Sequence, residues 1–204
     1  MAIRTAVNRA LTAITALPTA AALVNGNLTL LTTATASSSA TLDFTSSIDS
    51  TYDSYLFKFI NMHPATDSVT FNVNFRDGST AYDATKTTTF FRAYHNEGGS
   101  GQALEYQASQ DLPQSTAAQP LANDLGNDND QSCSGELFLY NPSSTTFVKH
   151  FMAKMESQAE NEYSYNLFIA GYCNVTAAID GVQFAMSSGN IDAGKIKLYG
   201  IKDS

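Results

Sequence analysis

The three histidines are the first candidates for metal ligands or catalytic bases, and they are widely dispersed. They are His63, His95 and His150, each at an end or on a face of an apolar run. A zinc site or a catalytic base is usually marked by close spacing, such as two histidines on one helical turn or a C-x-x-C pair. No such spacing occurs, so we expect surface or packing histidines and no bound metal.

Nucleophilic catalysis has no signature in this chain either. Serines are abundant, but no G-x-S-x-G elbow is present. A pair of carboxylates for glycoside hydrolysis leaves no mark in a sequence, because its separation is a property of the fold. We therefore expect a protein that is not an enzyme and that needs no cofactor.

One stretch is rich in the oxygen ligands that calcium prefers. It contains Asn123, Asp124, Asn127, Asp128, Asn129 and Asp130. It lacks the D-x-[DN]-x-[DN]-G-x₅-E frame of an EF-hand. A solvated loop is the expectation, and the alternative is a calcium site that uses Asp124, Asp128 and Asp130.

Aromatic and amide side chains gather in and beside residues 96–133, which have the weakest strand pattern. Glycines, Pro113 and Pro120 interrupt this segment, so we expect long loops around one strand at residues 104–109. Such loops often carry recognition. Tyr94, His95 and Tyr106 are accordingly the candidates for contact with a glycan.

The two cysteines, Cys133 and Cys173, stand far apart in the sequence and outside any C-x-x-C pair. Two isolated thiols are typical of a protein made in a reducing cytoplasm. A disulfide between them is possible on this evidence but nothing requires it.

Charge is low and unevenly distributed. The chain of 204 residues is 15% charged and has a net charge of −8, of which +2 lies in residues 1–42 and −10 in residues 43–204. An acidic body repels phosphate backbones, which argues against nucleic-acid binding. No apolar run is long enough to span a membrane, and polar residues interrupt the N-terminal stretch too often for a secretion signal.

Residues 2–17 have the periodicity of a helix with one apolar stripe. Arg4 and Arg9 lie beside the stripe, and Pro18 ends the pattern. A helix of this length is marginal alone in water, so the stripe must pack on its own domain, a neighbouring subunit or another protein. The candidate anchor residues are Ile3, Arg4, Val7, Arg9, Leu11, Ile14 and Leu17.

Residues 18–37 read as a connector that holds a possible edge strand at residues 28–31, and from residue 38 the pattern has period two. The expected strands are residues 40–44, 55–62, 69–76, 86–95, 104–109, 135–140, 146–155, 163–174, 182–186 and 195–201. The last two flank the loop SSGNIDAG, and we expect the final strand to insert between earlier strands. This pattern predicts an all-β, antiparallel jelly roll or β-sandwich of about nine or ten strands over residues 38–204, after an N-terminal helical arm and connector over residues 1–37.

Three blocks resemble a recurrent β-domain of tailed bacteriophages, which is encoded among virion structural genes. The resemblance covers roughly residues 37–202, and its three blocks read IDSTYDSYLFKFINMHPATDSVTFNVNFRDG, SGELFLYNPSSTTFVKHFMAKM and AGYCNVTAAIDGVQFAMSSGNIDAGKIKLYGIK. The N-terminal arm is the variable part of that group.

The resemblance implies a non-enzymatic protein of the virion surface, made in the host cytoplasm and trimeric. It leaves two locations open. The first is a capsid decoration or cement protein that binds the major capsid protein, and the second is a tail-fibre or adaptor domain that binds a tail protein and host glycans.

Overall fold

The computed structural model describes residues 28–202, which form twelve strands and no helix. All pairing is antiparallel and divides the strands between an eight-stranded and a four-stranded sheet. The strands are β1 (Leu28–Thr35), β2 (Leu42–Phe44), β3 (Ser54–Pro64), β4 (Val69–Arg76), β5 (Lys86–Asn96), β6 (Gln102–Tyr106), β7 (Gln119–Leu125), β8 (Cys133–Tyr140), β9 (Lys149–Gln158), β10 (Tyr163–Cys173), β11 (Gly181–Met186) and β12 (Ile191–Ile201).

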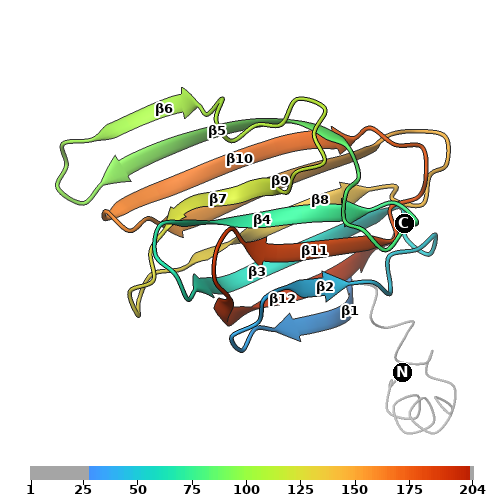
Figure 1. Cartoon of the computed structure of the whole chain (residues 1–204), viewed down its shortest axis with the longest axis horizontal. Helices are drawn as coiled ribbons and strands as arrows, with labels where there is room; N and C mark the ends of the chain where they lie inside the picture. Colours follow the sequence, from blue (N-terminus) through green and yellow to red (C-terminus); the bar gives the residue numbers. More distant parts are fainter. Residues whose placement is uncertain (1–27, 203–204) are drawn as a thin grey trace, which may run out of the picture.

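The two sheets pack face to face as a β-sandwich, as predicted. The large sheet has the order β1-β12-β3-β8-β9-β10-β5-β6, and the small sheet has the order β2-β11-β4-β7. Figure 1 shows the small sheet lying over the large one, with β6 and β1 at the two edges of the large sheet. One face of the large sheet is therefore covered by the small sheet. We call it the inner face, and the opposite face the outer face.

The core between the sheets is rich in phenylalanine. Phe184 of β11 lies at its centre, with its ring centroid 5.3 Å from that of Phe57 and 5.1 Å from that of Phe59. Edge-to-face contacts of this kind add to the free energy gained by burying the rings. In β4, Val69, Phe71, Val73 and Phe75 are all buried, which confirms the alternation predicted for that strand.

The last strand inserts between two earlier ones, as the sequence indicated. β12 pairs with β1 on one side and with β3 on the other. It begins at Ile191, so the expected loop SSGNIDAG contributes its second half to the strand. Gly194 interrupts the register at φ 125°, where a Cβ atom would lie 2.6 Å from the carbonyl oxygen of Asn61. A bulge that only glycine fits thus replaced the predicted turn.

β7 was not predicted, because residues 96–133 were expected to form loops around a single strand. Pro120 and the Asn-Asp pair at 123–124 are turn-forming residues, and Asp124 takes φ 55°. They are tolerated because β7 is an edge strand whose pairing with β4 is irregular. The other expected strand in this segment lies slightly earlier, at Gln102–Tyr106.

β1 belongs to the β-domain, although our boundary after residue 37 placed it with the connector. It pairs along most of its length with β12. The helix expected at residues 2–17, with its seven candidate anchor residues, lies outside the described residues.

Candidate functional site

The outer face of the large sheet carries an apolar row that crosses seven strands. Residues directly opposite one another on neighbouring strands point to the same face of a sheet. Following the register from strand to strand, one such row consists of Leu30, Tyr199, Leu56, Phe138, Met152, Ala170 and Thr89. No charged residue interrupts it.

The next row towards one end of the sheet is also uncharged. It contains Leu28, Ile201, Ser54 and Tyr140 on one side, and His150, Tyr172 and Thr87 on the other. We call these two rows together the uncharged band. The rings of Phe138 and Tyr140 stack within it, with centroids 6.2 Å apart.

Exposed apolar side chains are concentrated on the outer face. Among the described residues, nine large hydrophobic side chains are exposed, and the strand register places eight of them on this face. They are Leu28, Leu30, Ile60, Phe91, Leu104, Tyr106, Tyr140 and Met152. The ninth, Phe147, lies in the loop between β8 and β9. Four of the eight, Leu28, Leu30, Tyr140 and Met152, lie in the uncharged band, and grouped apolar side chains of this kind are typical of a binding site for another protein.

A hollow of about 480 Å³ lies in the uncharged band over β9, β10 and β5. Its floor includes Ala170, whose small side chain sits between the larger Met152 and Thr89 on the neighbouring strands. Tyr140, His150 and Tyr172 form further walls. The lining is almost wholly apolar, so the hollow fits an apolar side chain better than a polar ligand.

Charge on the outer face lies beyond the uncharged band. The third row across the sheet runs Lys197, Lys58, Glu136, Lys154, Phe168, Phe91 and Tyr106. Lys154 lies over the Phe168 ring, 5.6 Å from its centroid, and Phe168 stacks on Phe91 at 5.0 Å. The outer face thus has an uncharged end and a mixed, aromatic and charged end.

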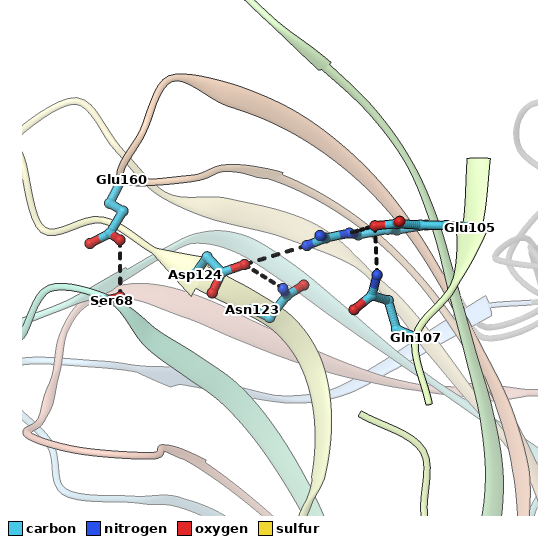
Figure 2. A network of polar contacts seen from close by, with 7 residues as sticks. Ser68, Glu105, Gln107, Asn123, Asp124 and Glu160 are labelled. Atoms are coloured by element: carbon cyan, nitrogen blue, oxygen red, sulfur yellow. Dashed lines mark hydrogen bonds and ion pairs between the residues drawn. The ribbon is translucent and has the colours of Figure 1, made fainter. Parts of the chain in front are cut away.

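The inner face carries a polar cluster where β5, β6 and β7 meet, shown in Figure 2. The Arg92 guanidinium donates to Glu105 at 2.9 Å and to Asp124 at 3.4 Å. It also lies over the ring of Tyr165, 4.4 Å from the centroid. Burial opposes the charge, but the hydrogen bond to Glu105 and the nearby carboxylates raise the pKa of Arg92 above its usual value. Arg92 therefore joins β6 and β7 to the large sheet, with one positive charge held between two carboxylates.

Amides complete this cluster. Gln107 donates to Glu105 at 2.6 Å, and the Asn123 amide nitrogen donates to Asp124 at 2.6 Å. The Asn123 carbonyl oxygen is buried without a hydrogen-bond partner among the described residues. Nearby, Ser68 donates to Glu160 at 3.0 Å.

The candidate glycan residues do not form one site. Tyr94 faces the inner side, where its ring packs against those of Tyr163 and Tyr165. His95 and Tyr106 lie on the outer face, in different rows. Tyr106 donates its hydroxyl proton to Asp111. The structure therefore separates Tyr94 from the other two.

The candidate metal ligands are also dispersed. His63 hydrogen-bonds through Nδ1 to the Gln131 carbonyl oxygen, whereas His95 and His150 lie on the outer face. Asp124 is engaged by Arg92, while Asp128 and Asp130 are exposed in the following loop. Within residues 28–202, no group of three or more histidine, cysteine or acidic side chains is placed to hold a metal ion.

Cys173 lies on the inner face between two buried lysines. Lys86 of β5 and Lys149 of β9 are its direct neighbours across the sheet. Lys86 donates to the carbonyl oxygens of Ala84 and Ala117, and Lys149 donates to that of Val175. Both lysines thus hold loops at one end of the sandwich.

The two cysteines are free and cannot pair in this fold. Cys133 lies opposite Ser157 and Cys173 lies opposite Lys149, so they are eight residues apart along β9. That is about 26 Å of extended strand. A disulfide needs Cα atoms within roughly 7 Å of each other.

Comparison with known proteins gives no family. No family model and no curated protein matches the chain. Among solved structures, a crystal structure of Scytalido-glutamic peptidase with a peptide-based transition-state analogue is similar at 9% identity, over 76% of this chain and 68% of that one, with a TM-score of 0.16. A TM-score this low carries no argument about fold or function. No helix within residues 28–202 is of a length and hydropathy that would cross a membrane.

The outer-face residues were missed as a site, although the sequence held a signal for them. Residues 135–140 and 163–174 are strand segments with little polar interruption in the sequence, and such strands are usually buried on both faces. In the structure one of these faces is covered by the small sheet and the other is open. Apolar residues on both faces of a strand thus indicate either a central strand or a binding surface.

Proposed function

We propose that the chain is a non-enzymatic structural protein of a bacteriophage virion, which decorates or cements the capsid surface through its N-terminal arm and through self-association. The observation that carries this proposal is the uncharged band on the outer face. A sheet that leaves two rows of mostly apolar side chains open across seven strands is suited to assembly with other proteins. Virion location itself rests on the resemblance of the three sequence blocks.

The strand order supports a jelly-roll body. In a jelly roll the first, eighth, third and sixth strands form one sheet, and the second, seventh, fourth and fifth form the other. We count β2 as the first strand and the meander β8–β10 as a single seventh strand. The small sheet β2-β11-β4-β7 then contains the first, eighth, third and sixth strands in the order of a jelly roll. In the large sheet, β3, the meander β8–β10, β5 and β6 are the second, seventh, fourth and fifth strands, again in the order of a jelly roll. β12 and β1 are additional strands beside β3.

The arm is the proposed attachment element. Its six apolar stripe residues are Ile3, Val7, Ala10, Leu11, Ile14 and Leu17. At about 1–2 kcal/mol each when buried, they would supply a gross gain of several kcal/mol, partly offset by ordering the arm. A trimer would present several arms, which makes attachment multivalent. The +2 charge of the arm suits an acidic capsid surface.

The test is to quantify the chain in purified virions against the major capsid protein. A capsid decoration is present in on the order of hundreds of copies, set by the symmetry of the shell. Absence of the chain from virions would contradict the proposal.

The attachment role of the arm is tested with two matched variants of the full chain. Leu11→Asp places a charge on the stripe, and Thr12→Asp places the same charge beside it. We expect the first variant alone to be lost from the particles, with the melting temperature of the β-domain unchanged in both. Equal retention of both variants would contradict the anchor.

The second candidate keeps the same body on the tail, as a fibre or adaptor domain that contacts host glycans. It is favoured only by the aromatic end of the outer face, where Phe168, Phe91 and Tyr106 adjoin one another. Copy number separates the two candidates, because a tail part is present in at most a few dozen copies. A glycan array without binding would count against the glycan contact.

A further inference from the structure

We propose that a second copy of the chain docks on the uncharged band, with Phe147 of one copy entering the hollow over Ala170 of the other. This inference deepens the proposed self-association by naming its surface. It stands on four features: the band, the hollow, the exposed phenylalanine beside it and the area of the face.

Phe147 has the properties of an anchor residue. It is 68% exposed, and it is the one exposed large hydrophobic side chain among residues 28–202 that lies outside the outer face. It sits in the loop joining Tyr140 to Lys149, at the end of the sheet where Tyr140 and His150 line the hollow. An aromatic side chain that fills an apolar pocket is the usual centre of a protein interface.

Three hydrogen bonds brace the loop that carries Phe147. The backbone N–H groups of Thr146 and Phe147 both donate to Ser144 Oγ, at 3.2 and 2.9 Å. Ser144 N–H in turn donates to the Asn141 carbonyl oxygen at 3.1 Å. An anchor fixed before binding loses little conformational entropy on docking, which favours association.

The area of the face meets the requirement of a stable interface. The seven strands that the uncharged band crosses, at about 4.8 Å spacing and each about ten residues long at roughly 3.3 Å per residue, give a face of about 1,100 Å². A standard interface buries about 800 Å² on each partner. The outer face alone can therefore supply one side of a specific oligomer.

A second copy is the occupant that the chain itself specifies. Anchor and hollow are different features of one molecule, and both lie at the uncharged end of the sheet. Lys58, Lys154 and Lys197 of the third row then lie at the margin of an interface centred on the uncharged band. Two copies can therefore meet without opposing these lysines directly, although the body as a whole is acidic.

The mass of the full chain in solution is the first test, by light scattering after gel filtration. Wild type is expected to have the mass of a dimer or a larger closed oligomer. Phe147→Asp and Met152→Asp place a charge on the anchor and on the hollow wall, and both are expected to lower the mass to that of a monomer. Leu104→Asp is the control, because Leu104 is 73% exposed on the same face but lies on the edge strand β6.

Melting temperatures of the three variants establish that each still folds, since all three positions are more than half exposed. A monomeric wild type overturns the inference, and this is the outcome expected if residues 1–27 of the same chain cover the face. An oligomer that Leu104→Asp weakens as much as Phe147→Asp also overturns it.

Disulfide trapping tests the named contact. Phe147→Cys and Met152→Cys chains are co-expressed, one of them tagged, and oxidised under mild conditions. Cys133 and Cys173 are buried and stay out of the reaction. A disulfide between tagged and untagged chains is expected, and the Leu104→Cys and Met152→Cys pair is expected to give none. Equal trapping in both pairs, or none in either, places the contact elsewhere and overturns the inference.

The outcome is independent of virion location. If the chain forms the oligomer with the trapped contact but is absent from virions, the proposed function is contradicted and this inference stands. A monomer that is nevertheless found in virions would do the reverse.

Discussion

Lys86 lies directly opposite Cys173 across the β5–β10 pair, and neither side chain reaches solvent. Within residues 28–202, no carboxylate accepts a hydrogen bond from this ammonium. Its described hydrogen bonds go to two backbone carbonyl oxygens, at 3.0 Å to Ala84 and 2.8 Å to Ala117. Burial lowers the pKa of Lys86 from 10.5 to about 8. The fold therefore holds an ammonium whose charged form is disfavoured, which has a measurable consequence.

We predict that wild type gains stability relative to Lys86→Met as the pH rises from about 8 to 10.5. In this window the unfolded chain still binds the proton and the folded chain has released it, so the free energy of unfolding increases with pH. The gain is on the order of 3 kcal/mol when fully developed, since one pKa unit corresponds to about 1.4 kcal/mol. Urea unfolding of both proteins at several pH values measures it.

The comparison with Lys86→Met is needed because other groups act in the opposite direction. Burial raises the pKa values of Tyr55 and Tyr165, so these tyrosines lower the stability as the pH approaches their unfolded pKa. Both proteins share that loss, and it cancels in the difference. A difference that stays constant from pH 7.5 to 10.5 would contradict the buried-lysine assignment.

We predict that neither cysteine reacts with a thiol reagent in the folded protein. Burial raises the pKa of Cys133 to about 12, and it does the same for Cys173 despite the nearby charges of Lys86 and Lys149. A buried, protonated thiol is a poor nucleophile. Titration with a chromogenic disulfide is expected to detect no thiol in buffer and two in urea. Rapid reaction of one thiol in buffer would show that its end of the sandwich opens.

We predict that Phe184→Ala is among the most destabilising single substitutions in the core. Phe184 is fully buried, and its ring contacts those of Phe44, Phe57, Phe59 and Phe71. Truncating a buried phenylalanine costs about 3–5 kcal/mol. Urea unfolding measures the loss. Gln183→Ala on the solvent side of the same strand is the control; it removes an exposed hydrogen bond of 2.7 Å to Asp43 and is expected to cost about 1 kcal/mol or less. Similar losses in both variants would mean that β11 is not packed as described.

Strand alternation predicted most of the fold because period two is a direct consequence of sheet geometry. In β9, Phe151, Ala153 and Met155 point inward and His150 and Lys154 outward, as their spacing indicated. Lys149 shares the inward side, although no sequence pattern predicted that it would be fully buried. Its burial depends on the Val175 carbonyl oxygen, which lies 26 residues away in the sequence.

The candidate site was less predictable, because it depends on which strands become neighbours. Leu30 and Met152 belong to the same row only because β12, β3 and β8 lie between their strands. No local pattern records that order. The predicted glycan residues failed to converge for the same reason: Tyr94 and His95 are adjacent in the chain, and adjacent residues of a strand point to opposite faces.

The last prediction concerns Arg92, for which Arg76 is a natural control. Each arginine donates through Nε to a partly exposed carboxylate, Arg92 to Glu105 at 2.9 Å and Arg76 to Asp180 at 2.8 Å. Arg92 alone also reaches a second acid and lies over the rings of Tyr94 and Tyr165.

Lysine keeps the charge but loses the planar fork and the stacking on the rings. We therefore expect Arg92→Lys to lower the free energy of unfolding by about 1–2 kcal/mol, and Arg76→Lys by less than about 1 kcal/mol. Urea unfolding of the two variants at the same ionic strength decides between them. Equal losses would show that the two rings and Asp124 add nothing to the Arg92–Glu105 pair, and that the cluster joining β6 and β7 to the large sheet is held by that pair alone.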